Sequence, residues 1–220
     1  MTDHCPLCMG DRAPPFHEDA RRSYLRCERC ALVFVPARFR LSRDEERAEY
    51  LRHENDVYDP GYRRFLSRLA DPLVQRLPPA SQGLDFGCGP APALAAMLEE
   101  QGHKVALYDS FFAPEMTALQ QRYDFVTASE VVEHLHDPAT ELQRLWSLIN
   151  EGGWLGVMTK LVRDRDAFAH WHYIRDPTHV CFFSRETWHW WAGQQGGTLE
   201  FVADDVMLLQ KRAAPPTSWP

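Results

Sequence analysis

The segment that decides the fold is GLDFGCGPAP, residues 83–92. It begins with a short apolar run that ends in an acidic residue, as a buried strand does where it reaches a turn. The glycine-rich part follows, and the Ala- and Leu-rich residues 93–101 predict a helix. Glycines let the backbone approach a ligand closely, and the first turn of a helix offers N–H groups without intrahelical partners. The segment therefore predicts a strand, a turn and a helix that bind a nucleotide-like ligand.

The acidic residue of this segment, Asp85, indicates the kind of ligand. It lies two positions before Gly87, the first glycine of the turn, and Pro92 stands where the dinucleotide pattern GxGxxG has its third glycine. A carboxylate at position 85 would repel a pyrophosphate, whereas it can pair with an amino group. The sequence therefore favours a cationic amino-acid ligand over a dinucleotide.

These residues resemble motif I of the class I S-adenosylmethionine (SAM)-dependent methyltransferases, an acidic residue followed by GxGxG, with Ala91 in place of the last glycine. Three further segments resemble the family in the order in which the family has them. They are VALYD at 105–109, YDFVTASEVVEHL at 123–135 and the turn NEGGWL at 150–155. The resemblance covers roughly residues 81–212, and it implies a Rossmann-like, doubly wound α/β sheet that binds SAM.

The resemblance also implies which residues bind the cofactor. Asp85 would meet the amino end of SAM, Gly87 and Gly89 would form the backbone-lined turn, and Asp109 would hold the ribose hydroxyls. The other candidates follow the same strand ends: Cys88, Ser110, Phe111, Ser129 and Glu130.

One interval is too short for the family's pattern. Fourteen residues separate Asp109 from Asp124, where the family fits a helix, a strand and another helix. We therefore expect a sheet that is trimmed around its third strand. Phe111 or Phe112 could stack on the adenine in place of the usual contacts, and burial of these rings in the core is the alternative.

The composition is that of a globular domain with a small addition, with 220 residues, 45% hydrophobic and 25% charged. Residues 1–80 carry 14 arginines against 13 acidic residues, and residues 81–220 carry 10 basic against 18 acidic residues. An acidic catalytic half disfavours nucleic acid as the substrate. No apolar run approaches the ~20 residues that cross a bilayer, and the N-terminus lacks the apolar core of a signal peptide, so we expect no membrane association and a cytoplasmic location.

Four of the six cysteines form two C-x-x-C pairs, with eighteen residues between the pairs: Cys5, Cys8, Cys27 and Cys30. This spacing is typical of a zinc ribbon, in which four thiolates close a tetrahedral structural site. Two disulfides or a redox dithiol are the alternatives, and the absence of a thioredoxin-like βαβ pattern around either pair disfavours both. We predict a zinc ribbon over residues 1–40.

Two helices are predicted between the ribbon and the catalytic domain, in a linker or cap over residues 41–80. The first begins at Ser42, with Glu45 three residues later, and runs toward residues 53–56; the second covers about 62–77. In the family that the chain resembles, such helices often lie over the cofactor. The resemblance thus makes His53, Asn55, Tyr58 and Tyr62 candidates for the substrate side of the site, and ordinary helix-surface and turn positions are the alternative. The catalytic domain then spans 81–212, and residues 213–220 are expected to be a disordered tail.

A long loop at residues 160–184 is the second function-like segment, because long irregular loops in compact domains are usually functional. It contains FAHWHYIRDPTHVCFF at 168–183, and HVCFFS at 179–184 resembles a loop of the ubiquinone-biosynthesis-like methyltransferases. A histidine of near-neutral pKa suits a general base. The base candidates are His134, His170, His172 and His179, and the substrate candidates in the loop are Trp171 and Tyr173. Structural hydrogen bonds or a His/Asp metal site are the alternatives for these histidines.

The preferred function is methyl transfer from SAM to a small metabolite. An RNA methyltransferase that grips its substrate with the ribbon is a second hypothesis, which the weakly basic residues 1–43 do little to support. A SAM-binding protein without catalysis is a third.

Overall fold

The computed structural model describes residues 4–52 and 56–213. Its main sheet has six strands in the order β5-β4-β6-β7-β10-β9. The strands are β4 (Gln82–Phe86), β5 (Lys104–Tyr108), β6 (Tyr123–Ser129), β7 (Ile149–Met158), β9 (Thr198–Ala203) and β10 (Val206–Gln210). The pairs β5·β4, β4·β6 and β6·β7 are parallel, whereas β10 is antiparallel to both β7 and β9. This is a mixed α/β sheet of the methyltransferase type, as the sequence predicts.

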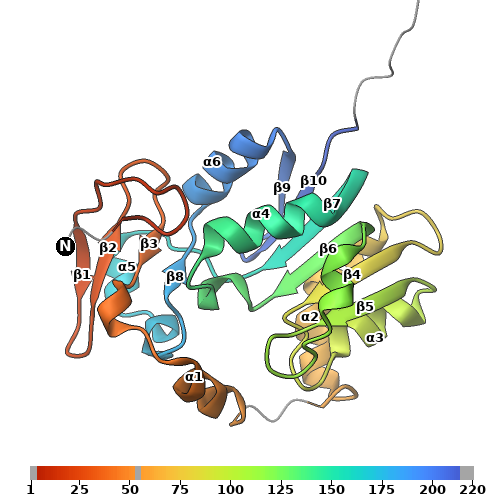
Figure 1. The fold of residues 1–220 in the computed structure, drawn as a ribbon, viewed down its shortest axis with the longest axis horizontal. Coiled ribbons are helices and arrows are strands. Elements are labelled where there is room, and N and C mark those ends of the chain that lie inside the picture. Colours follow the sequence, from red (N-terminus) through yellow and green to blue (C-terminus); the bar gives the residue numbers. More distant parts are fainter. Residues whose placement is uncertain (1–3, 53–55, 214–220) are drawn as a thin grey trace, which may run out of the picture.

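Helices cover both faces of the main sheet (Figure 1). Side chains alternate between the faces along each strand: Phe125 packs with α2 (Pro60–Val74) and α3 (Ala93–Glu100), and its neighbour Val126 packs with α4 (Pro138–Leu148). The alternation continues on β10, where Leu208 belongs to the first group and Met207 to the second. The core therefore consists of two apolar layers, one on each side of the sheet, and α6 (Arg185–Gln195) contributes to the second.

The main sheet ends at β5, without a further strand beyond it among the described residues, as the fourteen-residue interval predicts. Between β5 and β6 the chain forms one isolated bridge, Asp109 with Ala113, and the 3-10 helix η2 (Met116–Gln120). Within the described residues, no strand pairs with the outer side of β5.

A small sheet stands beside the main one, in the order β1-β2-β3-β8. Its first three strands, β1 (Pro15–Glu18), β2 (Ser23–Arg26) and β3 (Val33–Phe34), lie in residues 4–40, which we call the cysteine module. The fourth, β8 (Cys181–Phe182), comes from the long loop after β7, and its residues pair with Phe34 and Val33. The sheet of the cysteine module is thus completed by a strand from the catalytic half of the chain.

The long loop differs from the irregular segment that the sequence predicts. It contains α5 (Arg165–Ala169), the 3-10 helix η4 (His172–Arg175) and β8. Each of these elements is too short to show a periodic pattern of apolar residues, and β8 exists only because β3 pairs with it.

The two linker helices are present. The capping box of Ser42 and Glu45 starts α1 (Arg43–Tyr50), and the Asp59 side chain caps α2 by accepting the N–H of Tyr62 at 2.6 Å. The 3-10 helix η1 (Ala37–Phe39) precedes α1. In the part of the chain that the structure describes, no helix combines the length and the apolar character needed to cross a membrane.

Candidate active site

The turn after β4 requires glycine at position 87. Gly87 has φ +73°, a left-handed conformation that side chains rarely adopt, and its N–H donates to the carbonyl oxygen of Tyr108 at 2.7 Å. A Cβ at this position would lie 2.4 Å from a methyl carbon of Val131. Gly89 also has a positive φ, +63°, but nothing lies within 4 Å of its Cβ position. The backbone of this turn is therefore held between β5 and the segment after β6.

The carboxylate of Asp109 joins this turn to the end of β5. One oxygen accepts the N–H of Gly89 at 3.0 Å, and the other accepts the N–H groups of Phe111 and Phe112 at 2.8 and 3.0 Å. A carboxylate has about four acceptor positions, so it can also accept ligand hydroxyls. The carbonyl oxygen of the exposed residue Ser110 accepts a hydrogen bond from the Arg43 guanidinium group at 3.2 Å.

The second predicted carboxylate, Asp85, is 3% exposed and accepts the hydroxyl of Thr127 at 2.8 Å. Burial, together with the charge of Asp109, raises the pKa of Asp85 to about 7, against the opposing effect of the Thr127 hydrogen bond. The Cys88 thiol lies buried beside them, and burial with these two charges raises its pKa to about 12. A bound ammonium group would favour the ionised form of Asp85, so this carboxyl group fits the amino end of SAM.

Buried polar atoms gather after β6. Ser129 Oγ, Glu130 Oε1 and Glu133 Oε2 have no hydrogen-bond partner among the described residues. Glu130 also has φ +53°, which is uncommon for a residue with a side chain and is enriched at active sites. Burial raises the pKa of Glu130 to about 7, against the charges of Lys160 and Arg68. Because buried polar atoms are nearly always partnered, this group has the chemistry of a ligand site.

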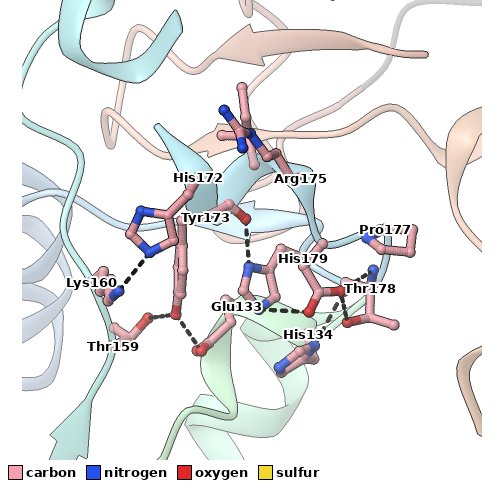
Figure 2. A network of polar contacts seen from close by, with 12 residues as sticks. Glu133, His134, Thr159, Lys160, His172, Tyr173, Arg175, Pro177, Thr178 and His179 are labelled. Carbon is pink, nitrogen blue, oxygen red and sulfur yellow. Dashed lines mark hydrogen bonds and ion pairs between the residues drawn. The ribbon is translucent and has the colours of Figure 1, made fainter. Parts of the chain in front are cut away.

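Glu133 belongs to the network in Figure 2, in which Tyr173 contacts Glu133, Thr159 and His179. Glu133 is fully buried, and the hydroxyl of Tyr173 donates to its carboxyl group. The Thr159 hydroxyl lies 3.3 Å from the Tyr173 hydroxyl, and the Glu133 carbonyl oxygen accepts the N–H of Val180 at 2.8 Å. Burial raises the pKa of Glu133 to about 8, with a smaller contribution from the charge of Glu130.

The structure brings together two of the four predicted base histidines. The rings of His134 and His179 lie 4.6 Å apart. His134 Nδ1 is 3.3 Å from the carbonyl oxygen of Thr178, and His179 Nδ1 is 2.8 Å from that of Tyr173. A carbonyl oxygen only accepts, so these contacts assign the proton to Nδ1 and make Nε2 the basic nitrogen of each neutral ring. Burial lowers the pKa of His179, although Asp176, whose carboxylate lies 3.8 Å from Nε2, opposes this.

The other two histidines lie elsewhere. His172 is exposed and its Nε2 is 2.9 Å from Lys160 Nζ, at the margin of the Glu133 network. His170 is also exposed, and its Nδ1 contacts the Asp166 carbonyl oxygen at 3.0 Å, within α5 and its cap. Nothing in the described structure links His170 to Glu133 or to the other three histidines.

Some of the predicted substrate residues belong to the Glu133 network, and others lie away from it. Trp171 packs on Tyr173, with 4.9 Å between ring centroids, and so belongs to the network. Tyr58 is 79% exposed. His53 and Asn55 lie outside the described residues.

Sequence reasoning missed Tyr50, the last residue of α1. Its ring lies 5.6 Å from Phe111 and 5.4 Å from His134, so it bridges the end of β5 and the histidine pair. Tyr62 on α2 was among the candidates; burial and the charges of Asp85 and Glu130 raise its pKa. The only signal for Tyr50 was an aromatic residue at the end of a polar helix, which does not say what the helix packs against.

The four cysteines of the C-x-x-C pairs meet in one buried cluster. Their sulfur atoms all lie within 4.8 Å of one another, and all four are free thiols. The Sγ distances are 3.5 Å for Cys5 to Cys30 and 3.4 Å for Cys8 to Cys27. Such a cluster is consistent with a small metal-binding module.

A cavity of about 750 Å³ lies between the cysteine module, the long loop and the turn from β9 to β10. Phe16, Phe168 and Trp171 supply aromatic surface, and Lys160, Arg163 and Asp205 supply charge. Its volume is in the range of small-molecule sites. Lys160 lines the cavity, and its charge also lowers the pKa of Glu130 in the site.

Comparison with known proteins bears on the family and the fold. A family model described as a methyltransferase domain matches residues 58–200. Two curated relatives are ubiquinone biosynthesis O-methyltransferases: that of Leptothrix cholodnii is 34% identical over 100 residues, covering 34% of this chain and 43% of that protein. That of Serratia proteamaculans is 35% identical over 71 residues, covering 32% of this chain and 30% of that protein. The chain thus spans less than half the length of the curated relatives it matches.

Among solved structures, the fold is similar to that of Burkholderia thailandensis 1,6-didemethyltoxoflavin-N1-methyltransferase with bound 1,6-didemethyltoxoflavin and S-adenosylhomocysteine. The TM-score is 0.51 at 17% identity, over 91% of this chain and all of that one. At this identity the likeness concerns the fold. The family model covers well over half of the chain, and the chain therefore belongs to the SAM-dependent methyltransferase family.

Proposed function

We propose that this chain transfers the methyl group of SAM to a small-molecule acceptor at the carboxyl ends of β4, β5 and β6. The observation that carries the proposal is the pair of carboxylates on either side of the glycine turn. Asp109 is hydrogen-bonded to the turn itself, at Gly89, and Asp85 is a buried carboxyl group whose ionisation a cation would favour. Together they fit the hydroxyl-bearing and ammonium ends of one cofactor.

When bound, SAM supplies an electrophilic methyl group on a sulfonium. The chain has to hold the acceptor in line with that methyl group, which is worth up to about 7–11 kcal/mol of the barrier. In the transfer, a bond forms between the acceptor atom and the methyl carbon while the bond from sulfur to that carbon breaks. A hydroxyl or amine acceptor also loses a proton, and we assign its acceptance to Nε2 of His134 or His179, the two ring nitrogens that the carbonyl contacts leave basic.

Three observations support a small acceptor rather than RNA. The cavity beside the long loop has the size of a small-molecule site. Residues 81–220 carry a surplus of acidic residues, which disfavours a polyanion. The relatives are named for ubiquinone biosynthesis, and the neighbour is named for the small molecule 1,6-didemethyltoxoflavin.

We also propose that the cysteine cluster holds a structural zinc ion. Tetrahedral Zn²⁺ with four thiolates requires sulfur–sulfur distances of about 3.8 Å, close to the 3.4 and 3.5 Å of the two closest pairs. Four thiolates leave no open coordination position, so the ion would stabilise the module rather than take part in the reaction.

The test has two stages. Calorimetry with S-adenosylhomocysteine should give measurable heat with the zinc-loaded protein, and its absence would refute the cofactor assignment. The protein is then incubated with methyl-labelled SAM and fractionated cell extract, and the label is followed by chromatography. Label in small molecules supports the proposal, label in RNA would favour the RNA methyltransferase, and binding without transfer to any fraction would favour a non-catalytic protein.

A further inference from the structure

The cysteine module holds the part of the long loop that carries Tyr173 and His179. The contact centres on Arg22, in the turn between β1 and β2, which is 5% exposed. Its guanidinium group donates to three carbonyl oxygens: those of Ile174 at 2.9 Å, Asp176 at 2.8 Å and Pro177 at 3.1 Å. Arg21 adds two exposed or partly buried hydrogen bonds, to the carbonyl oxygens of Arg175 at 2.7 Å and Ile174 at 3.1 Å. The buried Arg22 is therefore the centre of a contact that holds the backbone between the two site residues.

The orientation of Arg22 is itself fixed within the module. Its Nε donates to the Tyr24 hydroxyl at 3.0 Å, and that hydroxyl donates to Asp19 at 2.8 Å. Asp19 also accepts the backbone N–H of Arg22 at 2.9 Å. A guanidinium group has five donors in a rigid plane, so a single orientation serves both the module and the loop.

A second contact holds the other end of the same segment. The N–H of Val35 donates to the carbonyl oxygen of Val180 at 2.9 Å, and the N–H of Val180 donates to the carbonyl oxygen of Glu133 at 2.8 Å. Val180 thus lies between the module and the buried carboxyl group that accepts the Tyr173 hydroxyl. β3 and β8 continue this pairing through Cys181 and Phe182.

We infer that Arg22 is a positioning residue for methyl transfer, through which the cysteine module sets the place of His179 and Tyr173. The inference rests on the proposed function. His179 is two residues beyond the last carbonyl that Arg22 holds, and its own Nδ1 contact is to the carbonyl oxygen of Tyr173 in the same segment. A shift of the segment would move the ring and its hydrogen-bond partner together. Among the residues that the structure describes, no hydrogen bond or ion pair joins the glycine turn or Asp109 to this segment, so SAM binding should be independent of Arg22.

The experiment compares Arg22→Ala and Arg22→Lys with Arg12→Ala, each zinc-loaded. Arg12 lies in the same module and pairs with Glu28, but both side chains are at least half exposed, and among the described residues no hydrogen bond or ion pair joins the Arg12 side chain to the loop. Three quantities are measured: kcat and KM with the extract fraction that accepts label from the wild type, affinity for S-adenosylhomocysteine by calorimetry, and hydrogen exchange of residues 171–183 by mass spectrometry.

For Arg22→Ala we expect kcat to fall up to about 100-fold, because a displacement of about 1 Å can cost that much. Affinity for S-adenosylhomocysteine should stay within about twofold of wild type, since local structure at the glycine turn is kept. Exchange should rise in residues 171–183 and not in β4 or α3. Arg22→Lys keeps the charge but not the planar fork, so it should recover part of kcat, and Arg12→Ala should match the wild type.

Three outcomes would overturn the inference: wild-type kcat with unchanged loop exchange in Arg22→Ala, raised loop exchange with wild-type kcat, or an equal loss of kcat and of cofactor affinity. Should Arg22→Ala not fold, Arg22→Lys decides through the same three measurements. Failure of the proposed function is seen separately, as a wild type that transfers label to no fraction, and loop exchange then still decides whether Arg22 holds the segment.

Discussion

The two halves of the candidate site are built in different ways. In the cofactor half, the glycine turn, Asp85 and Asp109 come from neighbouring strands, and Asp109 bonds to a residue 20 positions away. In the acceptor half, the loop of residues 160–184 is hydrogen-bonded to Arg22 through carbonyl groups 152 to 155 positions away, and its strand β8 pairs with a strand of the cysteine module. The first half depends mainly on the parallel sheet, whereas the second depends on contacts between distant segments.

The comparison implies that the halves can fail separately. Damage to the cysteine module should remove transfer and spare cofactor binding. Damage to the glycine turn should remove cofactor binding and spare the loop.

The largest effect is expected from loss of a cysteine ligand. Cys27→Ser should release zinc and unfold the module, because the binding free energy of structural zinc, on the order of 10 kcal/mol, contributes to folding. Transfer should disappear while S-adenosylhomocysteine still binds. Zinc content by atomic absorption, calorimetry and label transfer check the three parts. Cys181→Ser provides the same substitution at a buried cysteine outside the cluster and should retain zinc; loss of cofactor binding in Cys27→Ser alone would show that the halves are not separable.

The next largest effect concerns the histidine pair. His134→Asn and His179→Asn should each lower transfer to a hydroxyl or amine acceptor, with the base among them losing about 10²- to 10⁴-fold in kcat. His170→Asn is the control, because His170 is exposed and its ring nitrogen contacts the Asp166 carbonyl oxygen of its own helix. Steady-state rates across pH 5–9 distinguish the base from its neighbour. Only removal of the base should abolish the fall in kcat toward low pH that protonation of the base causes. Equal rates in all three variants would mean that the acceptor needs no base, as for a carbon or thiolate nucleophile.

An intermediate effect is expected at the glycine turn. Gly87→Ala combines a strained backbone conformation with a Cβ 2.4 Å from Val131, and should cost about 2–4 kcal/mol of unfolding free energy. It should also abolish cofactor binding while leaving hydrogen exchange of residues 171–183 unchanged. Gly193→Ala, at a helical glycine with nothing within 4 Å, is the matched control and should stabilise by about 0.5–1 kcal/mol. A variant that keeps its affinity for S-adenosylhomocysteine would contradict the assigned cofactor site.

The two halves of the site also differ in how well the sequence predicts them. The cofactor half was predictable, because strand, turn and helix follow one another and each has a local signature: the apolar run before Asp85, the glycines, and the apolar strand that ends at Asp109. The short interval after Asp109 likewise predicted the sheet edge at β5. Which of these residues bind the cofactor stays a prediction.

For the acceptor half, the sequence predicts which residues are candidates but not how they are arranged in space. The sequence marks the histidines of the loop, but it cannot say that His134 meets His179 while His170 faces solvent, because that depends on how a segment with three short elements packs. Tyr50 and Arg22 were missed for the same reason. A helix-end tyrosine and a hairpin arginine have no local feature that separates them from surface residues, and only long-range packing gives them partners.

The last prediction concerns the buried carboxyl group of Glu133, whose burial is expected to raise its pKa. Glu133 has a pKa raised from 4.5 to about 8, so between these values the folded chain holds a proton that the unfolded chain has released. The free energy of unfolding should therefore fall as pH rises through this window, by up to about 1.4 kcal/mol per pH unit for this group. Glu133→Gln keeps an oxygen that accepts the Tyr173 hydroxyl but binds no proton, so its stability should fall less steeply from pH 5 to 8. Urea unfolding at several pH values measures the slopes, with Glu115→Gln as the same substitution at an exposed site. Parallel curves for wild type and Glu133→Gln would mean that Glu133 is ionised in the folded chain, and the cation that balances it would then have to come from the acceptor half.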